Sequence, residues 1–255
     1  MTTARHNRLA HRAWPTVSAK SLVLVPIGST EQHGPHLPLN TDSVIAESVA
    51  GRAAEELSAR LTPPPLVAPT LAYGASGEHA SFPGTVSIGH EALHAVIVET
   101  VRSLSLWAGR VVFVNGHGGN TATLDAALGA MHAEGHAVAW AGCGITGGDA
   151  HAGRTETSLM LYLAPEEVRI REAVAGDTRP LDVLMPLLTA HGVKAVSPSG
   201  VLGDPAGASA DEGRRHVRTM VSRLVGQITA ATTDERGRLL DLAARDRPGT
   251  KAAGR

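Results

Sequence analysis

Residues 25–42, VPIGSTEQHGPHLPLNTD, form the most informative segment of this 255-residue chain. They begin inside the apolar run Ser21–Ile27, which is typical of a buried strand, and continue into a polar loop. This loop contains Glu31, His33 and Asp42, three side chains of the types that bind divalent metals. The segment therefore predicts a metal site just beyond the end of a strand, and such a set is typical of hydrolases.

The loop alone leaves two interpretations of Asp42 open. Glu31 and His33 are two residues apart, so in an extended segment they point the same way. Asp42 lies at the expected start of a helix, where the macrodipole favours an anion, and a carboxylate there could bridge two cations. Asp is also a preferred N-cap, so a charged turn capped by Asp42 is the alternative.

The rest of the chain alternates between expected strands and expected helices. The strands are predicted at Ser21–Ile27, Leu66–Ala68, Arg110–Val114 and Ala137–Ala141, and the helices at Ser43–Arg60, His90–Trp107, Thr121–Glu134, Glu156–Leu163 and Asp211–Ala231. Such alternation predicts an α/β domain with a mainly parallel sheet. Ligands of these sheets bind beyond the carboxyl ends of strands, so separated loops can converge there.

Both ends of the chain are expected to lie outside this domain. Residues 1–20 are interpreted as a polar N-terminal arm, and residues 234–255 as a charged, flexible C-terminal tail. A single domain is therefore predicted over residues 21–233.

Composition narrows the classes of partner. A formal net charge of -1 provides no general attraction to nucleic acid or to an anionic membrane, which favours small molecules or peptides. The single cysteine, Cys143, excludes an intramolecular disulfide, and no apolar run approaches the roughly 20 residues that span a bilayer. We therefore expect a cytoplasmic protein. Thirteen histidines against only 3% aromatic residues favour a metal site.

Two later segments contain further candidate side chains. Residues 115–120, NGHGGN, follow an expected strand and present the imidazole of His117; no Gly-Lys-Ser/Thr follows, which argues against nucleotide binding. Residues 149–158, DAHAGRTETS, contain His151 and Glu156, for which a hydrogen-bonded loop histidine and an ordinary first-turn carboxylate are the alternatives.

A weaker pair, Glu78 and His79, lies in the glycine-rich loop of residues 70–89. These two side chains either reach the pocket or have a structural role, and the sequence favours neither. The loop itself is expected to line the pocket.

The order and spacing of these segments resemble the creatininase family of metal-dependent amidohydrolases. The matching text is PIGSTEQHGPHLPLNTD, FPGTVSIG, VNGHGGN and DAHAGRTETS, within residues 21–165. The resemblance implies a three-layer α/β/α fold with a mainly parallel sheet. It also implies two divalent metal ions, Fe, Zn or Mn, and a homo-oligomer that is often a hexamer.

The resemblance also implies a role for each candidate ligand. Glu31, Asp42 and His117 are similar in position to the ligands of one metal. Asp42 would bridge to a second metal, which His33 also binds.

The last ligand and the catalytic residue come from the third segment. Creatininase proper has a glutamate at the position of Gly119, so Glu156 is expected to supply the missing carboxylate. His151 is the expected catalytic residue, which donates a hydrogen bond to the oxyanion or protonates the leaving nitrogen.

One position bears on the substrate. Creatininase proper has a tryptophan where this chain has Gly147, and the loss of a flat aromatic wall argues against creatinine and for a larger substrate. The segments AYGASGEHASFPGTVSIG and GVLGDPAGASADEG resemble the mycofactocin-system branch of the family. That resemblance implies release of the modified C-terminal Val-Tyr dipeptide from a precursor peptide. The alternatives are an amidohydrolase acting on a small cyclic amide or formamide, and a metal-binding subunit without catalysis.

Overall fold

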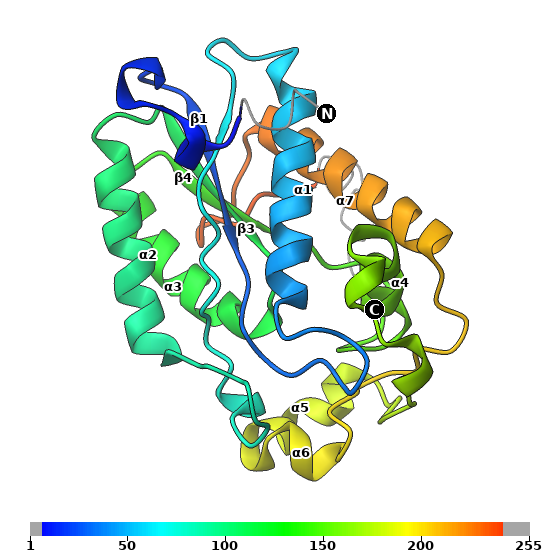
Figure 1. Ribbon diagram of the computed structural model, residues 1–255. Helices are drawn as coiled ribbons and strands as arrows, with labels where there is room; N and C mark the ends of the chain where they lie inside the picture. The colour runs from blue at the N-terminus through cyan, green and yellow to red at the C-terminus, as the bar shows by residue number, and fades with distance from the viewer. Residues whose placement is uncertain (1–6, 242–255) are drawn as a thin grey trace, which may run out of the picture.

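A four-stranded parallel sheet forms the centre of the protein (Figure 1), and the computed structural model describes residues 7–241. Its strands are β1 (Leu22–Ile27), β2 (Leu66–Val67), β3 (Arg110–Asn115) and β4 (Val138–Gly142). They lie in the order β2-β1-β3-β4, and every neighbouring pair is parallel. β1 and β3 are the central strands, and both are rich in buried β-branched residues, as expected for a sheet covered on both faces.

Helices cover both faces of this sheet. One layer consists of α1 (Thr41–Ser58), α4 (Arg154–Leu163) and α7 (Ala210–Ala230), and the other of α2 (Gly89–Ser105) and α3 (Thr121–Ala133). Alternate residues of β1 supply the two cores, since Leu22 and Leu24 pack in the first and Val23 and Val25 in the second. The expected three-layer α/β/α fold with a parallel sheet is confirmed.

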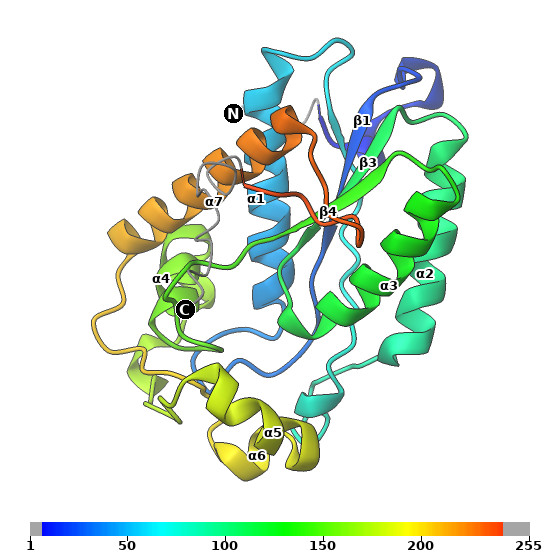
Figure 2. The same cartoon turned by 180° about the vertical axis from the view of Figure 1, so that it is seen from behind.

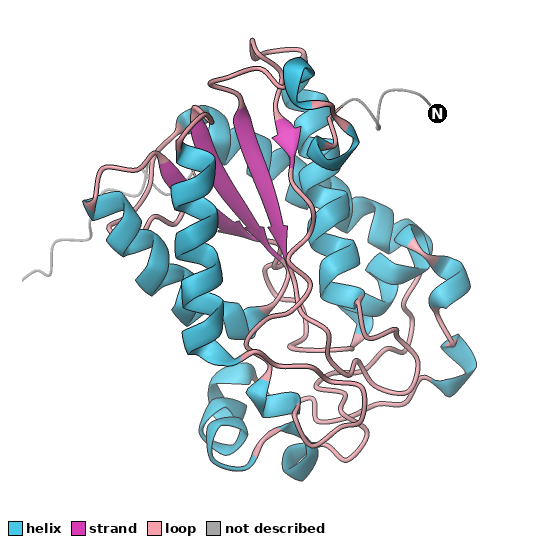
Figure 3. Cartoon of the chain, turned by 60° about the vertical axis from the view of Figure 1, so that its left-hand side comes forward, coloured by secondary structure: helices cyan, strands magenta, loops and turns pink. Residues whose placement is uncertain are grey.

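The register of the strands determines which loops meet. Ile27, the last residue of β1, pairs with Asn115 at the end of β3, and Asn115 pairs in turn with Gly142 at the end of β4. Three loops therefore leave the sheet at the same level and along the same edge. Figure 3 shows the strands ending at this cluster of loops.

Two helices lie in a region where the sequence predicted none. These are α5 (Leu181–His191) and α6 (Val193–Val196), which lie beyond the carboxyl edge of the sheet (Figure 2). α5 contains Pro186, and apolar residues lie on both its buried and its exposed sides, so it lacks a clear amphipathic pattern. The described residues also contain the short 3₁₀ helices η1 (Leu9–His11), η2 (Trp14–Thr16), η3 (Gly77–His79), η4 (Gly118–Asn120), η5 (Pro165–Glu167) and η6 (Ile170–Glu172).

The packed part of the chain extends beyond the predicted limits of residues 21 and 233. Near the start, Val67 N donates to Asn7 O, and Arg8 forms a parallel bridge with Val67. Near the end, Trp140 N donates to Gly237 O. The arm from residue 7 and the tail to residue 241 are thus part of the fold, while residues 1–6 and 242–255 lie outside the described region. No helix within residues 7–241 is long and apolar enough to cross a membrane.

The contact between α4 and α7 provides a test of the packing. A Cβ on Gly213 would overlap the backbone carbonyl of Ser158, whereas a Cβ on Gly226 of the same helix would meet nothing within 4 Å. Gly213→Ala should therefore lower the free energy of unfolding by about 1–3 kcal/mol. Gly226→Ala should leave it unchanged or raise it by up to about 1 kcal/mol, because alanine is the better helix former. Urea unfolding followed by circular dichroism measures both; equal effects of the two substitutions would contradict the packing.

Candidate metal centre

The loop after β1 places Glu31 and His33 side by side in the interior. Glu31 N donates to Leu39 O, and His33 pairs with Leu37, so the loop folds back on itself. Both side chains are fully buried. His33 Nδ1 lies 3.1 Å from Glu31 O and donates to it, so in the neutral imidazole that binds a metal the Nε2 lone pair faces the site. Histidines that bind metals commonly have this arrangement.

Asp42 lies in the first turn of α1 and is not its N-cap, because the cap position belongs to Asn40. The capping interpretation is therefore wrong. Ser29 Oγ donates to Asp42 Oδ2 over 2.7 Å. Asp42 Oδ1 lies 3.1 Å from His33 Nε2, and Oδ2 lies 3.2 Å from His117 Nδ1. One carboxylate thus faces two different histidines with its two oxygens.

His117 leaves the end of β3 in a fixed orientation. The Asn115 side chain makes two hydrogen bonds with the backbone of His117. Asn115 Nδ2 donates to His117 O over 2.7 Å, and His117 N donates to Asn115 Oδ1 over 3.2 Å. His117 Nε2 donates to Ala75 O over 3.1 Å, so in the neutral imidazole that binds a metal the Nδ1 lone pair faces Glu31 and Asp42. Gly116 is required here, because a Cβ at this position would overlap the carbonyl oxygen of Asp42.

The third loop brings Glu156 close to His33. α4 begins at Arg154, two residues before the predicted start, and the Asp149 carboxylate accepts from Arg154 N and Thr155 N at this end. Ala152 N donates to Glu156 Oε2 over 2.6 Å, and this oxygen lies 3.9 Å from His33 Nε2. The Glu156 side chain is 20% exposed and therefore lies toward the outside of the site.

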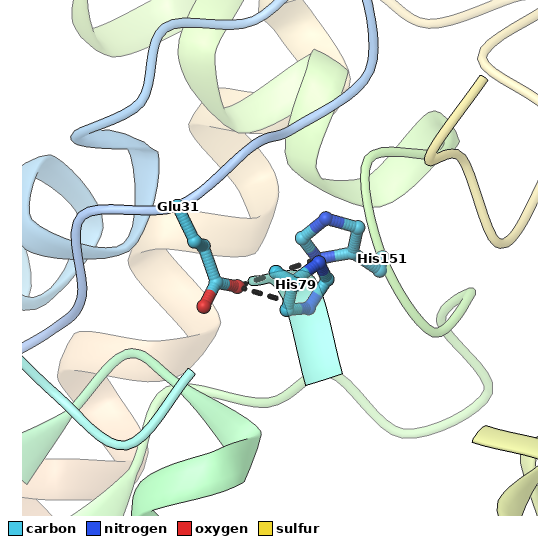
Figure 4. Close-up of side chains that lie close together, drawn as sticks. All are labelled: Glu31, His79 and His151. Atoms are coloured by element: carbon cyan, nitrogen blue, oxygen red, sulfur yellow. Dashed lines mark ion pairs between the residues drawn. The ribbon is translucent and has the colours of Figure 1, made fainter. Parts of the chain in front are cut away.

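Together these loops form three overlapping groups of possible metal ligands. Within each group, every residue has one ligand atom within 4.8 Å of those of the other two. The first group is Glu31, Asp42 and His117, the second is His33, His151 and Glu156, and the third is Glu31, His79 and His151. The structure thus brings together all six residues that the sequence singled out. It also places His79, one of the weaker pair of candidates, with Glu31 and His151 (Figure 4).

His79 and Gln32 are the parts of the site that sequence reasoning did not establish. His79 ends η3 in the glycine-rich loop and is buried, with Nε2 3.4 Å from Glu31 Oε1. Its neighbour Glu78 remains 32% exposed, 3.8 Å from His117 Nε2. Gln32 is buried and lies in the sequence between two predicted ligands, but a glutamine is not typical of a metal site, so the sequence analysis did not select it.

The charges of the central residues compensate one another. Burial raises the pKa of Glu31, but His117 outweighs this and lowers that pKa to about 2. Burial lowers the pKa of His33, yet Asp42 raises it to about 10. Burial alone would lower the pKa of His117 and raise that of Asp42. The charge of Glu31 instead holds the pKa of His117 well above its usual value, and the charge of His33 holds the pKa of Asp42 well below its usual value. Burial, with the charge of Asp42, raises the pKa of Glu156 to about 7.

The donor set fits divalent cations. Both carboxylate oxygens of Glu31 are buried and accept no hydrogen bond from the described residues, a costly state for a carboxylate unless a positive charge lies beside it. Glu31, Asp42 and His117 converge on one position, and His33, Asp42 and Glu156 lie around a second. At Gly119, a Cβ would overlap His117 Nε2 and lie 2.8 Å from Glu78 Oε1. The backbone therefore leaves no room at this position for a metal-binding side chain.

The fold and this centre define a hydrolase with a metal-binding site at the carboxyl edge of a parallel sheet. The sequence profile of the creatininase family, described as creatinine amidohydrolase, matches residues 10–228. The chain belongs to the creatininase family.

The chain is also similar to individual proteins of this family. The chain is 51% identical over 229 residues to the mycofactocin precursor peptide peptidase of Mycobacterium ulcerans (strain Agy99), a match that covers 89% of each protein. It also resembles a solved creatininase mutant of the Zn-Zn type, with a TM-score of 0.71 and 25% identity over 88% of this chain and 97% of the other. A creatininase structure with Mn has a TM-score of 0.71 and 25% identity, covering 88% of this chain and 98% of the other.

Metal binding should release protons. The pKa of His33 is raised to about 10 and that of His117 is also raised, so both imidazoles favour the charged form in the apoprotein, yet only a neutral imidazole binds a cation. Titration of the apoprotein with Zn²⁺ should therefore release protons, and the apparent affinity should weaken as the pH falls. Calorimetry in buffers of different ionisation enthalpy counts the protons. A heat that is independent of the buffer would contradict the assignment of these two ligands.

Proposed function

We propose that the chain is a dinuclear metal-dependent peptidase that removes the modified C-terminal Val-Tyr dipeptide from a mycofactocin precursor peptide. The observation that carries the proposal is the position of Asp42 between two histidines. Its Oδ1 lies 3.1 Å from His33 Nε2 and its Oδ2 lies 3.2 Å from His117 Nδ1, and these histidines belong to two different groups of possible metal ligands. The similarity to relatives named mycofactocin precursor peptide peptidase supports the choice of substrate.

The residues divide into two proposed ligand sets. Glu31, Asp42 and His117 hold one divalent cation. Asp42, His33 and Glu156 hold the second. Two bound cations supply Lewis-acid activation of water and polarisation of the amide carbonyl. The mixture of nitrogen and oxygen donors suits Zn, Mn or Fe.

His151 is the proposed proton carrier. Its Nε2 lies 2.8 Å from Gln32 O and donates to it, so Nδ1 has the free lone pair. This Nδ1 faces inward, 3.8 Å from Glu31 Oε1. A neutral imidazole in this orientation can take a proton from the attacking water and return it to the leaving nitrogen.

The surroundings favour a substrate larger than creatinine. A Cβ on Gly147 would meet no heavy atom within 4 Å, so the loop before His151 leaves open space where creatininase proper has an aromatic wall. Among the ligands, Glu156 is the one with an appreciably exposed side chain, at 20%, which marks the side from which a peptide reaches the centre. This openness supports a peptide over the alternative, a small cyclic amide or formamide.

The proposed assembly is a homo-oligomer, a hexamer as the resemblance to creatininase implies. α5 supports this, because its apolar residues Leu181, Val183 and Met185 are each about half exposed, at 47%, 51% and 48%. Exposed apolar side chains that lie close together are typical of subunit contacts.

Glu156→Gln tests the second ligand set. The amide keeps the size of the side chain but removes its charge, so the variant should bind one metal tightly where the wild type binds two, and turnover should fall at least about 10²-fold. Glu167→Gln, on the exposed η5, is the matched control and should behave as wild type. Metal content after dialysis is measured by inductively coupled plasma mass spectrometry. Two tightly bound metals with full activity in Glu156→Gln would show that another residue supplies this ligand.

The substrate is tested by mass spectrometry of reaction products. Metal-loaded protein is incubated with the modified precursor peptide, the unmodified peptide and creatinine in parallel. We expect a dipeptide-derived fragment from the modified peptide alone, because the modified peptide is the proposed substrate and the site lacks an aromatic wall for creatinine. Hydrolysis of creatinine with an intact modified peptide would favour the small-amide alternative.

A further inference from the structure

The orientation of the Gln32 side chain is fixed by its neighbours. Gly34 N donates to Gln32 Oε1 over 2.9 Å, so this atom is the amide oxygen. Gln32 Nε2 donates to Gly200 O over 3.1 Å. The amide group therefore has one further hydrogen to donate from Nε2.

That second hydrogen is directed to His79. Gln32 Nε2 lies 2.8 Å from His79 Nδ1 and 3.0 Å from His151 Nε2. His151 Nε2 already donates its own hydrogen to Gln32 O, so it does not accept from the amide. His79 Nδ1 is consequently an acceptor and has no hydrogen.

The tautomer of His79 follows. A neutral imidazole without a hydrogen on Nδ1 has it on Nε2, and Nε2 of His79 faces the centre, 3.4 Å from Glu31 Oε1. This nitrogen has no free lone pair for a cation, so His79 is a hydrogen-bond donor and not a ligand. The adjacent His151 presents the opposite tautomer to the same position, with its ring centre 4.5 Å from that of His79.

We infer that His79 is a second catalytic residue, whose Nε2–H stabilises the oxyanion of the tetrahedral intermediate, and that Gln32 is the positioning residue that fixes its tautomer. The inference rests on the proposed amide hydrolysis for its chemical step. The hydrogen-bond pattern on which the tautomer depends is independent of the substrate.

The two histidines complete the reaction without a further reagent. Water attacks the scissile carbonyl carbon and gives one proton to His151 Nδ1, while the carbonyl oxygen gains negative charge and accepts a hydrogen bond from His79 Nε2. When the carbonyl re-forms, the C–N bond breaks and the leaving nitrogen takes the proton from His151. Both imidazoles then have the tautomers with which they began.

The backbone near residue 200 is shaped around this arrangement. Gly200 has a φ of +83°, and a Cβ there would overlap Gln32 Oε1. Leu202 N donates to His151 O over 2.9 Å, so the same segment holds both Gln32 and His151. Its sequence, GVLGDPAG from residue 200, therefore contributes to the positions of the two histidines without a reactive side chain of its own.

The tautomer is tested directly by solid-state NMR of Zn²⁺-loaded protein labelled with ¹⁵N-histidine. The His79 signals are identified by their loss in His79→Gln. We expect a protonated Nε2 and an unprotonated Nδ1 in the wild type. Gln32→Glu replaces the donor with an acceptor and should move the hydrogen to Nδ1. A protonated Nδ1 in the wild type, or an Nε2 shift characteristic of a zinc ligand, would overturn the inference even if no substrate were cleaved.

Kinetics of cleavage of the modified peptide test the role. His79→Leu should lower kcat about 10²–10³-fold with KM and metal content unchanged, as loss of one oxyanion donor does. His79→Gln, whose amide nitrogen can take the place of Nε2, should restore part of this loss. His132→Leu, at an exposed position of α3, is the control and should retain full activity. Unchanged kcat in His79→Leu, or a loss of metal, would exclude the donor role. Absence of cleavage by the wild type would instead refute the proposed function.

Discussion

The ion pairs of the Asp42 carboxylate are the interaction on which the site depends. Its two oxygens lie within 3.2 Å of nitrogens from two different loops, and Ser29 holds the same group from a third direction. A buried carboxylate is stable only when charge and hydrogen bonds compensate its desolvation. Because Asp42 lies in the first turn of α1, the positive end of that helix adds to this compensation.

Much of this arrangement could be predicted from the sequence because parallel strands carry their loops to one edge. The apolar run before Gly28 and the β-branched run before Asn115 predicted two strands, and their register then brings Glu31 and His117 together. The metal-binding residue types made these loops recognisable. The family resemblance supplied the roles, which spacing alone left open.

Other parts could not be predicted, for physical reasons. α5 contains a proline and has apolar residues on two sides, so its stability comes from packing of Leu184 and Leu188 against Leu202 and Phe82 and not from a periodic pattern. His79 acquires its role through a hydrogen bond with Gln32, and the direction of such a bond depends on contacts that a sequence does not contain. The pairing of Arg8 and Arg238 with the sheet could not be predicted, because backbone groups form it and no side-chain pattern indicates it.

These ordered ends have a consequence for the behaviour of the protein in concentrated solution. β2 and β4 are the outer strands of the sheet, and outer strands offer unpaired backbone groups to other molecules. Arg8 pairs alongside β2 and Arg238 alongside β4, so each outer strand is covered by a charged segment from one end of the chain. The segments around residues 8 and 238 thereby protect the outer strands from pairing with another molecule, and a truncation that removes either segment would expose a strand edge that it covers.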